Sequence, residues 1–387
     1  MRRISRWDDG ISARVPSFVG SAGLVPGVTG AGANLQSMKY RTYPKTDITV
    51  SDVGFGLWTT ATDWWGTMTD GEAVALLHEA RDLGITLFDA ADTYGNGRSE
   101  EQLALAFGDA RDGVVYSTKF GYDFYTYAGE RRGQQEIPHD FTPAFVRYAL
   151  EQSLRRLRTD VIDIYSIHNA HLSELANDEL FALLESFKAE GKIRSYGVAL
   201  GPAIGWLVEG CEAARRRNVT SVQMIWNIFE QFPGREMLRA ANDAGADTGY
   251  QIRVPHSSGM LEGRYTADTV FPPGDHRIHR PRSWLLAGVQ KVETLRFLET
   301  AERTLGQASM QWLLAEPRTM TVLPNIYNRE QLVEFAGASE CAPLTPDEMS
   351  RIAELAKTNF GVEEPPMKYK GTMSADALQD APVAASV

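Results

Sequence analysis

The sequence predicts an α/β fold, a single (β/α)₈ TIM barrel, because short apolar strands alternate with amphipathic helices along the central part of the chain. Polar or charged residues also directly follow several of these strands, and in such a barrel those strand ends share one face. With 387 residues, 43% of them hydrophobic, the chain can bury one large core. One barrel therefore explains the pattern better than two unrelated domains.

Each predicted strand is a short apolar run, and each predicted helix has apolar residues at helical spacing. The predicted strands are 53–57, 85–89, 114–119, 162–168, a segment around Val198, 222–226, 248–254 and 321–323. The predicted helices are 70–83, 99–107, 143–157, 178–190, 203–217, 235–243, 308–314 and 329–337. Asp70 fits a helix N-cap, and the run from Ser99 to Gln102 has the pattern of a capping box.

The two ends of the chain differ in composition from the barrel, which we place at 38–360. Residues 1–37 are interrupted by glycine and proline and lack the continuous apolar core of a secretory signal. We expect either a flexible N-terminal extension or an over-long start. Residues 361–387 end in a small, polar tail without an apolar period, and we expect this segment to be mostly disordered.

Charge and cysteine content exclude several classes of function. The net charge of −11 argues against a nucleic-acid or anionic-membrane partner. No apolar run approaches the roughly 18 residues of a membrane span. Cys211 and Cys341 lie far apart in the sequence, which predicts neither a disulfide framework nor a metal cluster. A cytoplasmic enzyme without a metal fits these observations best.

Four residues suited to acid–base chemistry follow three of the predicted strands. Asp89, Lys119 and His168 each end a strand, and Tyr94 lies five residues after Asp89. A tyrosine with the ordinary pKa of about 10 is a poor proton donor at neutral pH, so a catalytic phenol needs a neighbouring cation. Each residue alone also has a structural interpretation, such as a surface lysine or a packed histidine. Together the four predict one acid–base site.

In this order and in these strand-end contexts, the four residues resemble the catalytic tetrad of the aldo-keto reductase family, and the resemblance covers roughly 38–360. It implies that family's (β/α)₈ barrel, with a small hairpin at 39–49 closing its N-terminal end. It also implies an NADP(H)- or NAD(H)-dependent oxidoreductase that reduces a carbonyl to an alcohol. Tyr94 would donate the proton, Lys119 and Asp89 would tune it, and His168 would orient the carbonyl oxygen.

The resemblance is incomplete at the nicotinamide end of the implied cofactor site. Gln223 matches the glutamine that binds the nicotinamide carboxamide. Ala199 and Leu200 replace a polar pair, and Arg253 stands where an aromatic ring stacks on the nicotinamide. An arginine can stack on a ring, but it repels the oxidised, cationic nicotinamide. We therefore expect weakened cofactor binding, or none.

The adenosine end of the implied cofactor site is also altered. Gln331 matches a family residue near the adenine, whereas Tyr327 stands at the basic position for the 2′-phosphate and Phe335 replaces an asparagine. Arg329 lies close enough in sequence to restore a phosphate contact.

The predicted partner is a small-molecule carbonyl or hydroxyl substrate, and an oligomer is compatible with the sequence. Long connections at 121–141 and 255–284 follow strands and are of a length that often covers a site. The predicted substrate-binding residues are Trp58, Tyr122, Asn169 and His256.

Two other functions are compatible with the sequence. The first is hydride-independent acid–base catalysis by a dehydratase, isomerase or cyclase, with Arg253 holding the substrate where nicotinamide would lie. The second is a non-catalytic subunit that uses the same barrel.

Overall fold

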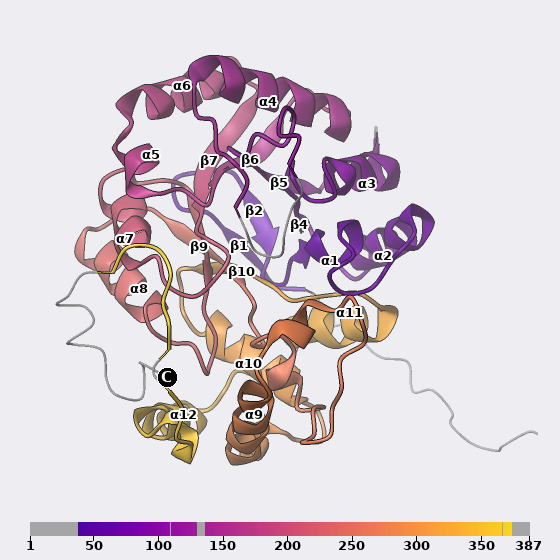
Figure 1. Cartoon of the computed structure of the whole chain (residues 1–387), viewed down its shortest axis with the longest axis vertical. Helices are drawn as coiled ribbons and strands as arrows, with labels where there is room; N and C mark the ends of the chain where they lie inside the picture. The colour runs from indigo at the N-terminus through magenta and orange to yellow at the C-terminus, as the bar shows by residue number, and fades with distance from the viewer. Residues whose placement is uncertain (1–37, 109, 130–135, 366, 374–387) are drawn as a thin grey trace, which may run out of the picture. The chain divides into compact units, whose positions relative to one another are not determined.

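The computed structural model describes residues 38–108, 110–129, 136–365 and 367–373. Its centre is a parallel sheet in the order β10-β9-β8-β7-β6-β5-β4-β3 (Figure 1). The strands are β3 (Phe55–Gly56), β4 (Leu87–Asp89), β5 (Val115–Phe120), β6 (Ile162–His168), β7 (Ile193–Ala199), β8 (Ser221–Ile225), β9 (Gly249–Arg253) and β10 (Thr319–Leu323). Val322 on β10 bonds to the backbone of Asp52 at 2.9 Å and of Gly54 at 2.8 Å, just before β3. These bonds close the sheet, and the predicted (β/α)₈ barrel is confirmed.

Helices connect the strands and surround the sheet (Figure 1). They are α1 (Trp58–Ala61), α2 (Asp70–Asp82), α3 (Arg98–Phe107), α4 (Pro143–Leu157), α5 (Leu172–Ala176), α6 (Asp178–Ala189), α7 (Leu207–Arg215), α8 (Gly234–Asp243), α9 (Arg282–Leu295), α10 (Leu305–Leu314), α11 (Arg329–Ala336) and α12 (Pro346–Lys357). The short helices α1 and α5 were not predicted, and neither were α9 and α12. Helix α12 has Met349, Ile352 and Ala356 at helical spacing, although only Ile352 is fully buried, so the apolar period was present in the sequence and was missed.

The starts of two helices differ from the prediction. The N-cap of α2 is Thr69, whose side chain forms a capping box with Glu72, so Asp70 is already the first helical residue. Ser99 is not a cap, because its hydroxyl donates to the carbonyl of Ala91 at 2.8 Å. Helix α3 begins one residue earlier, after Gly97 in the left-handed conformation. Both differences arise from local hydrogen bonds. The residue types alone do not determine which residue is the cap.

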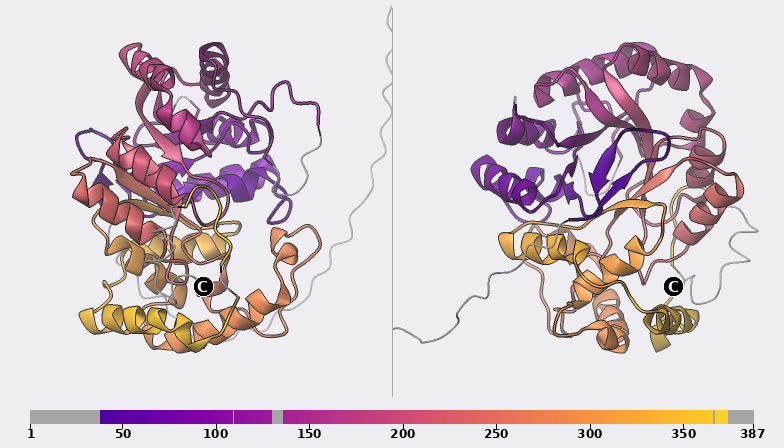
Figure 2. Two further views of the ribbon diagram at one scale, coloured as in Figure 1. Left: turned by 60° about the vertical axis from the view of Figure 1, so that its left-hand side comes forward. Right: turned by 180° about the vertical axis from the view of Figure 1, so that it is seen from behind.

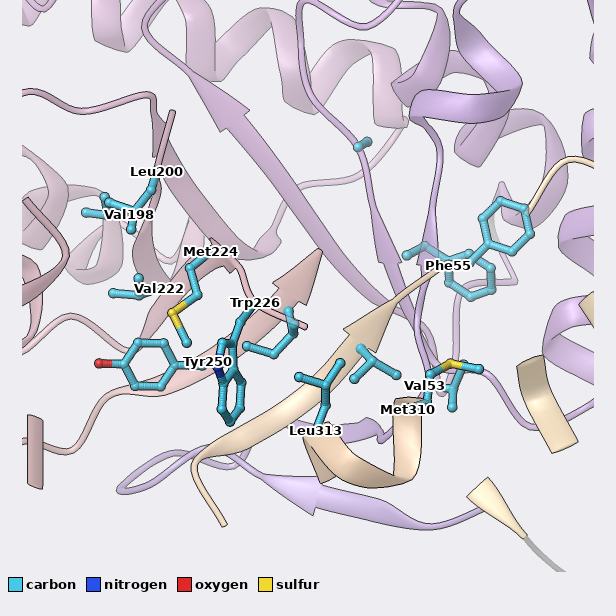
Figure 3. Packing of buried hydrophobic residues seen from close by; sticks show 14 of the residues in the cluster. Val53, Phe55, Val198, Leu200, Val222, Met224, Trp226, Tyr250, Met310 and Leu313 are labelled. Carbon is cyan, nitrogen blue, oxygen red and sulfur yellow. The ribbon is translucent and has the colours of Figure 1, made fainter. Parts of the chain in front are cut away.

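Apolar side chains of neighbouring strands pack in rows against the helices. Val198, Val222 and Tyr250 are register partners on β7, β8 and β9, and all three are fully buried. Figure 3 shows this row together with Trp226 and Leu313. The apolar rows stabilise the sheet as a rigid support for the residues at its strand ends.

A short antiparallel hairpin precedes the barrel, as expected from the resemblance. Its strands are β1 (Tyr40–Thr42) and β2 (Thr49–Ser51). The connecting turn places Tyr43, fully buried, in an apolar cluster with Leu87 and Ile164 near the strand starts. Seen from behind in Figure 2, the hairpin crosses this end of the sheet. It closes the end of the barrel opposite to Asp89 and the other charged strand ends.

Part of the C-terminal segment is attached to the barrel. The backbone amide of Trp206 donates to the carbonyl of Lys370 at 2.8 Å, and the amide of Lys370 donates to Ile204 at 3.0 Å. These bonds use backbone groups, so the small, polar composition of the segment does not reveal them. Residues 1–37 and 374–387, for which we expected an extension and a tail, lie outside the described residues. Within the described part, no helix is long and apolar enough to cross a membrane.

Replacing Tyr43 by alanine should lower the free energy of unfolding by about 3 to 5 kcal/mol, because it removes a fully buried ring from the barrel's closed end. Urea denaturation measures this change. The matched control is Tyr40→Ala on the same hairpin. Tyr40 is 49% exposed, so this variant should change the free energy of unfolding by less than about 1 kcal/mol. Equal losses for the two variants would contradict this role of Tyr43.

Candidate active site

The charged ends of β4 and β5 meet in a buried ion pair. Lys119 Nζ donates to Asp89 Oδ2 at 2.7 Å and to the carbonyl of Ala90 at 2.6 Å. The lysine side chain is 1% exposed and the aspartate 6%. Burial lowers the pKa of Lys119, but the Asp89 carboxylate and the Tyr94 phenol raise it, and the net shift is upward. Lys119 is therefore a cation at neutral pH.

Tyr94 and His168 lie beside this ion pair. Lys119 Nζ is 4.8 Å from the centroid of the Tyr94 ring, and the Tyr94 and His168 rings are 5.9 Å apart at 78°. The turn that presents Tyr94 continues through Gly95 with φ 60°, where a Cβ would lie 2.4 Å from the carbonyl of Ala61. Only glycine fits there. The structure thus brings the four predicted tetrad residues together.

Two further polar residues extend this group into the barrel interior, and the sequence analysis did not single them out. Ser117 donates to Asp89 Oδ1 at 3.0 Å, and Gln251 Nε2 donates to Ser117 Oγ at 3.5 Å, the long limit of a hydrogen bond. Gln251 accepts from Gln223 Nε2 at 3.1 Å. The sequence did contain a signal for Ser117. It lies two residues before Lys119, and a strand places residues at this spacing on the same face.

Two of the predicted substrate-binding residues lie next to His168. The rings of Tyr122 and His168 meet edge to face with centroids 5.0 Å apart. The Tyr122 hydroxyl donates to Glu136 at 3.1 Å, and the Asn169 amide donates both to Glu136 at 3.2 Å and to that hydroxyl. These contacts form a polar wall beside the tetrad.

The other two predicted substrate-binding residues have different surroundings. Trp58 packs against Trp65, 6.1 Å away, and His276, 5.6 Å away, in an aromatic cluster. His256 is fully buried, stacks on Phe335 at 4.9 Å and accepts from the backbone amide of Asn325. Burial and the nearby Arg277 lower the pKa of His256 to about 3, so this ring is neutral. We do not retain His256 as a substrate ligand, because its ring is enclosed by other side chains.

Arg253 reaches across the strand ends from β9 to the segment after β7. Its Nη2 donates to the carbonyl of Leu200 at 2.9 Å and to the carbonyl of Gly201. Burial lowers the pKa of Arg253, whereas the nearby Tyr94 and Asp89 raise it, and the net shift is downward. The guanidinium therefore lies on the same side of the barrel as the tetrad, bonded to backbone oxygens.

The two residues predicted at the adenosine end lie on α11. Gln331 is buried, accepts from the amide of Tyr327 at 3.2 Å and donates to Glu262 at 3.4 Å. Burial raises the pKa of Glu262 to about 7, although the bond from Gln331 opposes this shift. Arg329 is 74% exposed and pairs with Glu79 at 2.7 Å, so its cation already has a carboxylate partner.

Over the described ranges, no group of three or more histidine, cysteine, aspartate or glutamate side chains is placed to hold a metal ion.

Comparisons with known proteins agree with this geometry. The sequence is 28% identical over 305 residues to an aldo-keto reductase of Schizosaccharomyces pombe named for NADP(+), covering 75% of this chain and 84% of that protein. It is 27% identical over 310 residues to the NADH-specific methylglyoxal reductase of Escherichia coli, covering 76% and 91%. The solved holo form of aldo-keto reductase AKR11C1 from Bacillus halodurans superposes with a TM-score of 0.65 at 26% identity, covering 82% and 96%.

The sequence pattern of the Aldo/keto reductase family matches residues 52–357, which include the whole barrel sheet and the four clustered acid–base residues. The chain therefore belongs to the aldo/keto reductase family, and it is an NAD(P)H-dependent oxidoreductase of that family.

Proposed function

We propose that this oxidoreductase reduces a small carbonyl compound to an alcohol and that Tyr94 donates the proton. The observation that supports this role most strongly is the buried Lys119–Asp89 pair beside the Tyr94 ring. An ammonium next to a phenol favours loss of the phenolic proton, and the carboxylate holds that ammonium in place. Tyr94 can consequently protonate the carbonyl oxygen as negative charge develops on it.

His168 completes the proposed site as the residue that orients the substrate. Its ring stands nearly perpendicular to the Tyr94 ring and is flanked by Tyr122. A carbonyl oxygen between the phenol and the imidazole would receive hydrogen bonds from both, which aligns it for reduction. NAD(P)H supplies the hydride when it is bound.

The nicotinamide end of the cofactor fits the side chain of Gln223 on β8. Gln223 is a buried amide within the polar group that contains Asp89, and it offers carbonyl and amide groups complementary to a carboxamide. Together with the oxidoreductase names of both curated relatives, this amide supports hydride chemistry over the hydride-independent alternative.

The adenosine end fits NADH better than NADPH, because the arginines around α11 already have carboxylate partners. Arg329 pairs with Glu79, and Arg264 pairs with Glu330 at 3.1 Å. Arg277 pairs with Asp275 and is buried against aromatic rings. A 2′-phosphate needs a cation that can reach it, whereas ribose hydroxyls are bound by carboxylates.

Glu262 strengthens this preference. Its carboxyl group lies beside Gln331 and close to Tyr327, the two residues that the resemblance places at the adenosine end. A ribose 2′-hydroxyl can hydrogen-bond to this carboxyl group whether or not it is ionised, and the fraction that is ionised near its pKa of about 7 would repel a 2′-phosphate. We therefore assign NADH as the preferred cofactor.

Tyr94→Phe should lower kcat for reduction of small aldehydes by at least about a hundredfold, because the proton donor is lost while the ring remains. The rate is followed as NADH absorbance with a panel of small aldehydes. Tyr165→Phe is the matched control, since it removes a buried hydroxyl that has no hydrogen-bond partner in the described part of the chain. Retention of more than about a tenth of the rate by Tyr94→Phe would exclude it as the donor.

Calorimetry should show NADH bound more tightly than NADPH, with NADPH weaker than roughly 100 μM, because the cations around α11 are already paired. NAD⁺ should bind more weakly than NADH, because Arg253 opposes the positive charge of the oxidised ring.

Arg253→Tyr should therefore tighten NAD⁺ more than NADH, and the control Arg329→Gln should change neither. Equal affinity of the unmodified protein for NADH and NADPH would contradict the cofactor assignment. Equal effects of Arg253→Tyr on both redox forms would show that Arg253 does not face the nicotinamide.

A further inference from the structure

We propose that Ser117 and Gln251 are positioning residues that couple the Asp89–Lys119 pair to the amide of Gln223 through one directed chain of hydrogen bonds. This inference rests on the proposed function, in which Gln223 holds the nicotinamide carboxamide. It assigns to two interior residues a role in cofactor binding as well as in the geometry of the acid–base pair.

The chain crosses the inside of the barrel. Ser117 lies on β5 and Gln251 on β9, and β6, β7 and β8 separate these strands in the sheet. Their side chains can meet only in the interior, where Ser117 and Gln251 are each 1% exposed and Gln223 is 4% exposed. Bulk water does not compete with these bonds at this burial, although the Tyr43 hydroxyl also lies within hydrogen-bonding reach of Gln251.

The negative charge of Asp89 sets the direction of every bond in the chain. An ionised carboxylate only accepts, so Ser117 gives its single hydrogen to Asp89 Oδ1. The Ser117 oxygen must then accept, so Gln251 turns its Nε2 toward it and its Oε1 toward Gln223. Gln223 in turn presents its Nε2 to Gln251. Its own Oε1 is thereby left for another donor.

This orientation suits the ligand that the proposed function requires. A nicotinamide carboxamide has an NH₂ group, which donates, and the Oε1 of Gln223 accepts. Without the chain, the Gln223 amide could turn over and meet the carboxamide oxygen instead, because its oxygen and nitrogen ends are nearly the same in shape, so the chain selects one of two carboxamide orientations. The ion pair that serves the proton step therefore also fixes the amide that serves the cofactor.

A neighbouring residue shows that interior hydroxyls need not join such a chain. Thr321 on β10 is the register partner of Gln251, and its buried hydroxyl has no hydrogen-bond partner within the described residues. Thr321→Val removes this hydroxyl at nearly constant volume. It is the matched control for the chain, since it changes an adjacent interior position without breaking a bond.

The test measures the Kd of NADH by its fluorescence on binding, together with kcat for aldehyde reduction. Gln251→Met keeps the length of the side chain but removes its amide, and it should weaken NADH binding about fivefold to tenfold. Ser117→Ala should also weaken NADH binding. Because Ser117 lies on β5 and is linked to Gln223 only through Gln251, this loss would show that the effect passes along the chain. Ser117→Thr, which keeps the hydroxyl, should restore most of the affinity. Thr321→Val should bind NADH like the unmodified protein.

The double variant distinguishes coupling from two separate effects. If the chain acts as a unit, Gln251→Met with Ser117→Ala should bind NADH no more weakly than Gln251→Met alone. Fully additive losses, or unchanged affinity in both single variants, would overturn the inference and leave the proposed function intact. If Gln251→Met does not fold, Ser117→Ala and its threonine counterpart decide the question by the same measurement. Failure of the unmodified protein to bind NADH or NADPH would overturn both proposals.

Discussion

A lysine ammonium that is 1% exposed needs a fixed counter-ion, and in this protein Asp89 provides it at 2.7 Å. Removing either partner would leave an uncompensated buried charge, at a cost of about 3 to 5 kcal/mol. The pair also joins β4 to β5 at their C-terminal ends and places a cation beside the Tyr94 ring. The stability of the site and the acid–base chemistry that we propose for it therefore depend on the same contact.

The barrel makes this contact possible by bringing strand ends that are distant in sequence to one edge. The bonds of Val322 to the chain before β3 close the sheet, and the hairpin with Tyr43 fills the opposite end with apolar side chains. Polar groups can consequently be concentrated at the other end and along the interior line from Asp89 to Gln223. An interior network of this kind is stable only when each donor finds its acceptor.

The sequence was informative where a regular period or a strand end carried the signal. The parallel barrel follows from alternating apolar segments, and Asp89, Lys119 and His168 stand directly at strand ends. Contacts that depend on tertiary neighbours could not be predicted in this way. The pairing of Arg329 with Glu79 and the enclosure of His256 belong to this class. Ser117 and Gln251 are intermediate cases, since strand alternation places them inside but does not reveal their partners.

The most direct test of the central claim is the pH dependence of kcat for reduction with NADH in Lys119→Met. A cation beside the Tyr94 phenol favours its deprotonation. Loss of Lys119 should therefore move the alkaline limb of the pH–kcat profile to higher pH and lower kcat. Lys291→Met, which breaks the ion pair between another buried lysine and the partly exposed Glu364, should leave the alkaline limb in place and serves as the control. An alkaline limb at the same pH in Lys119→Met and in the unmodified protein would contradict the role assigned to the ion pair.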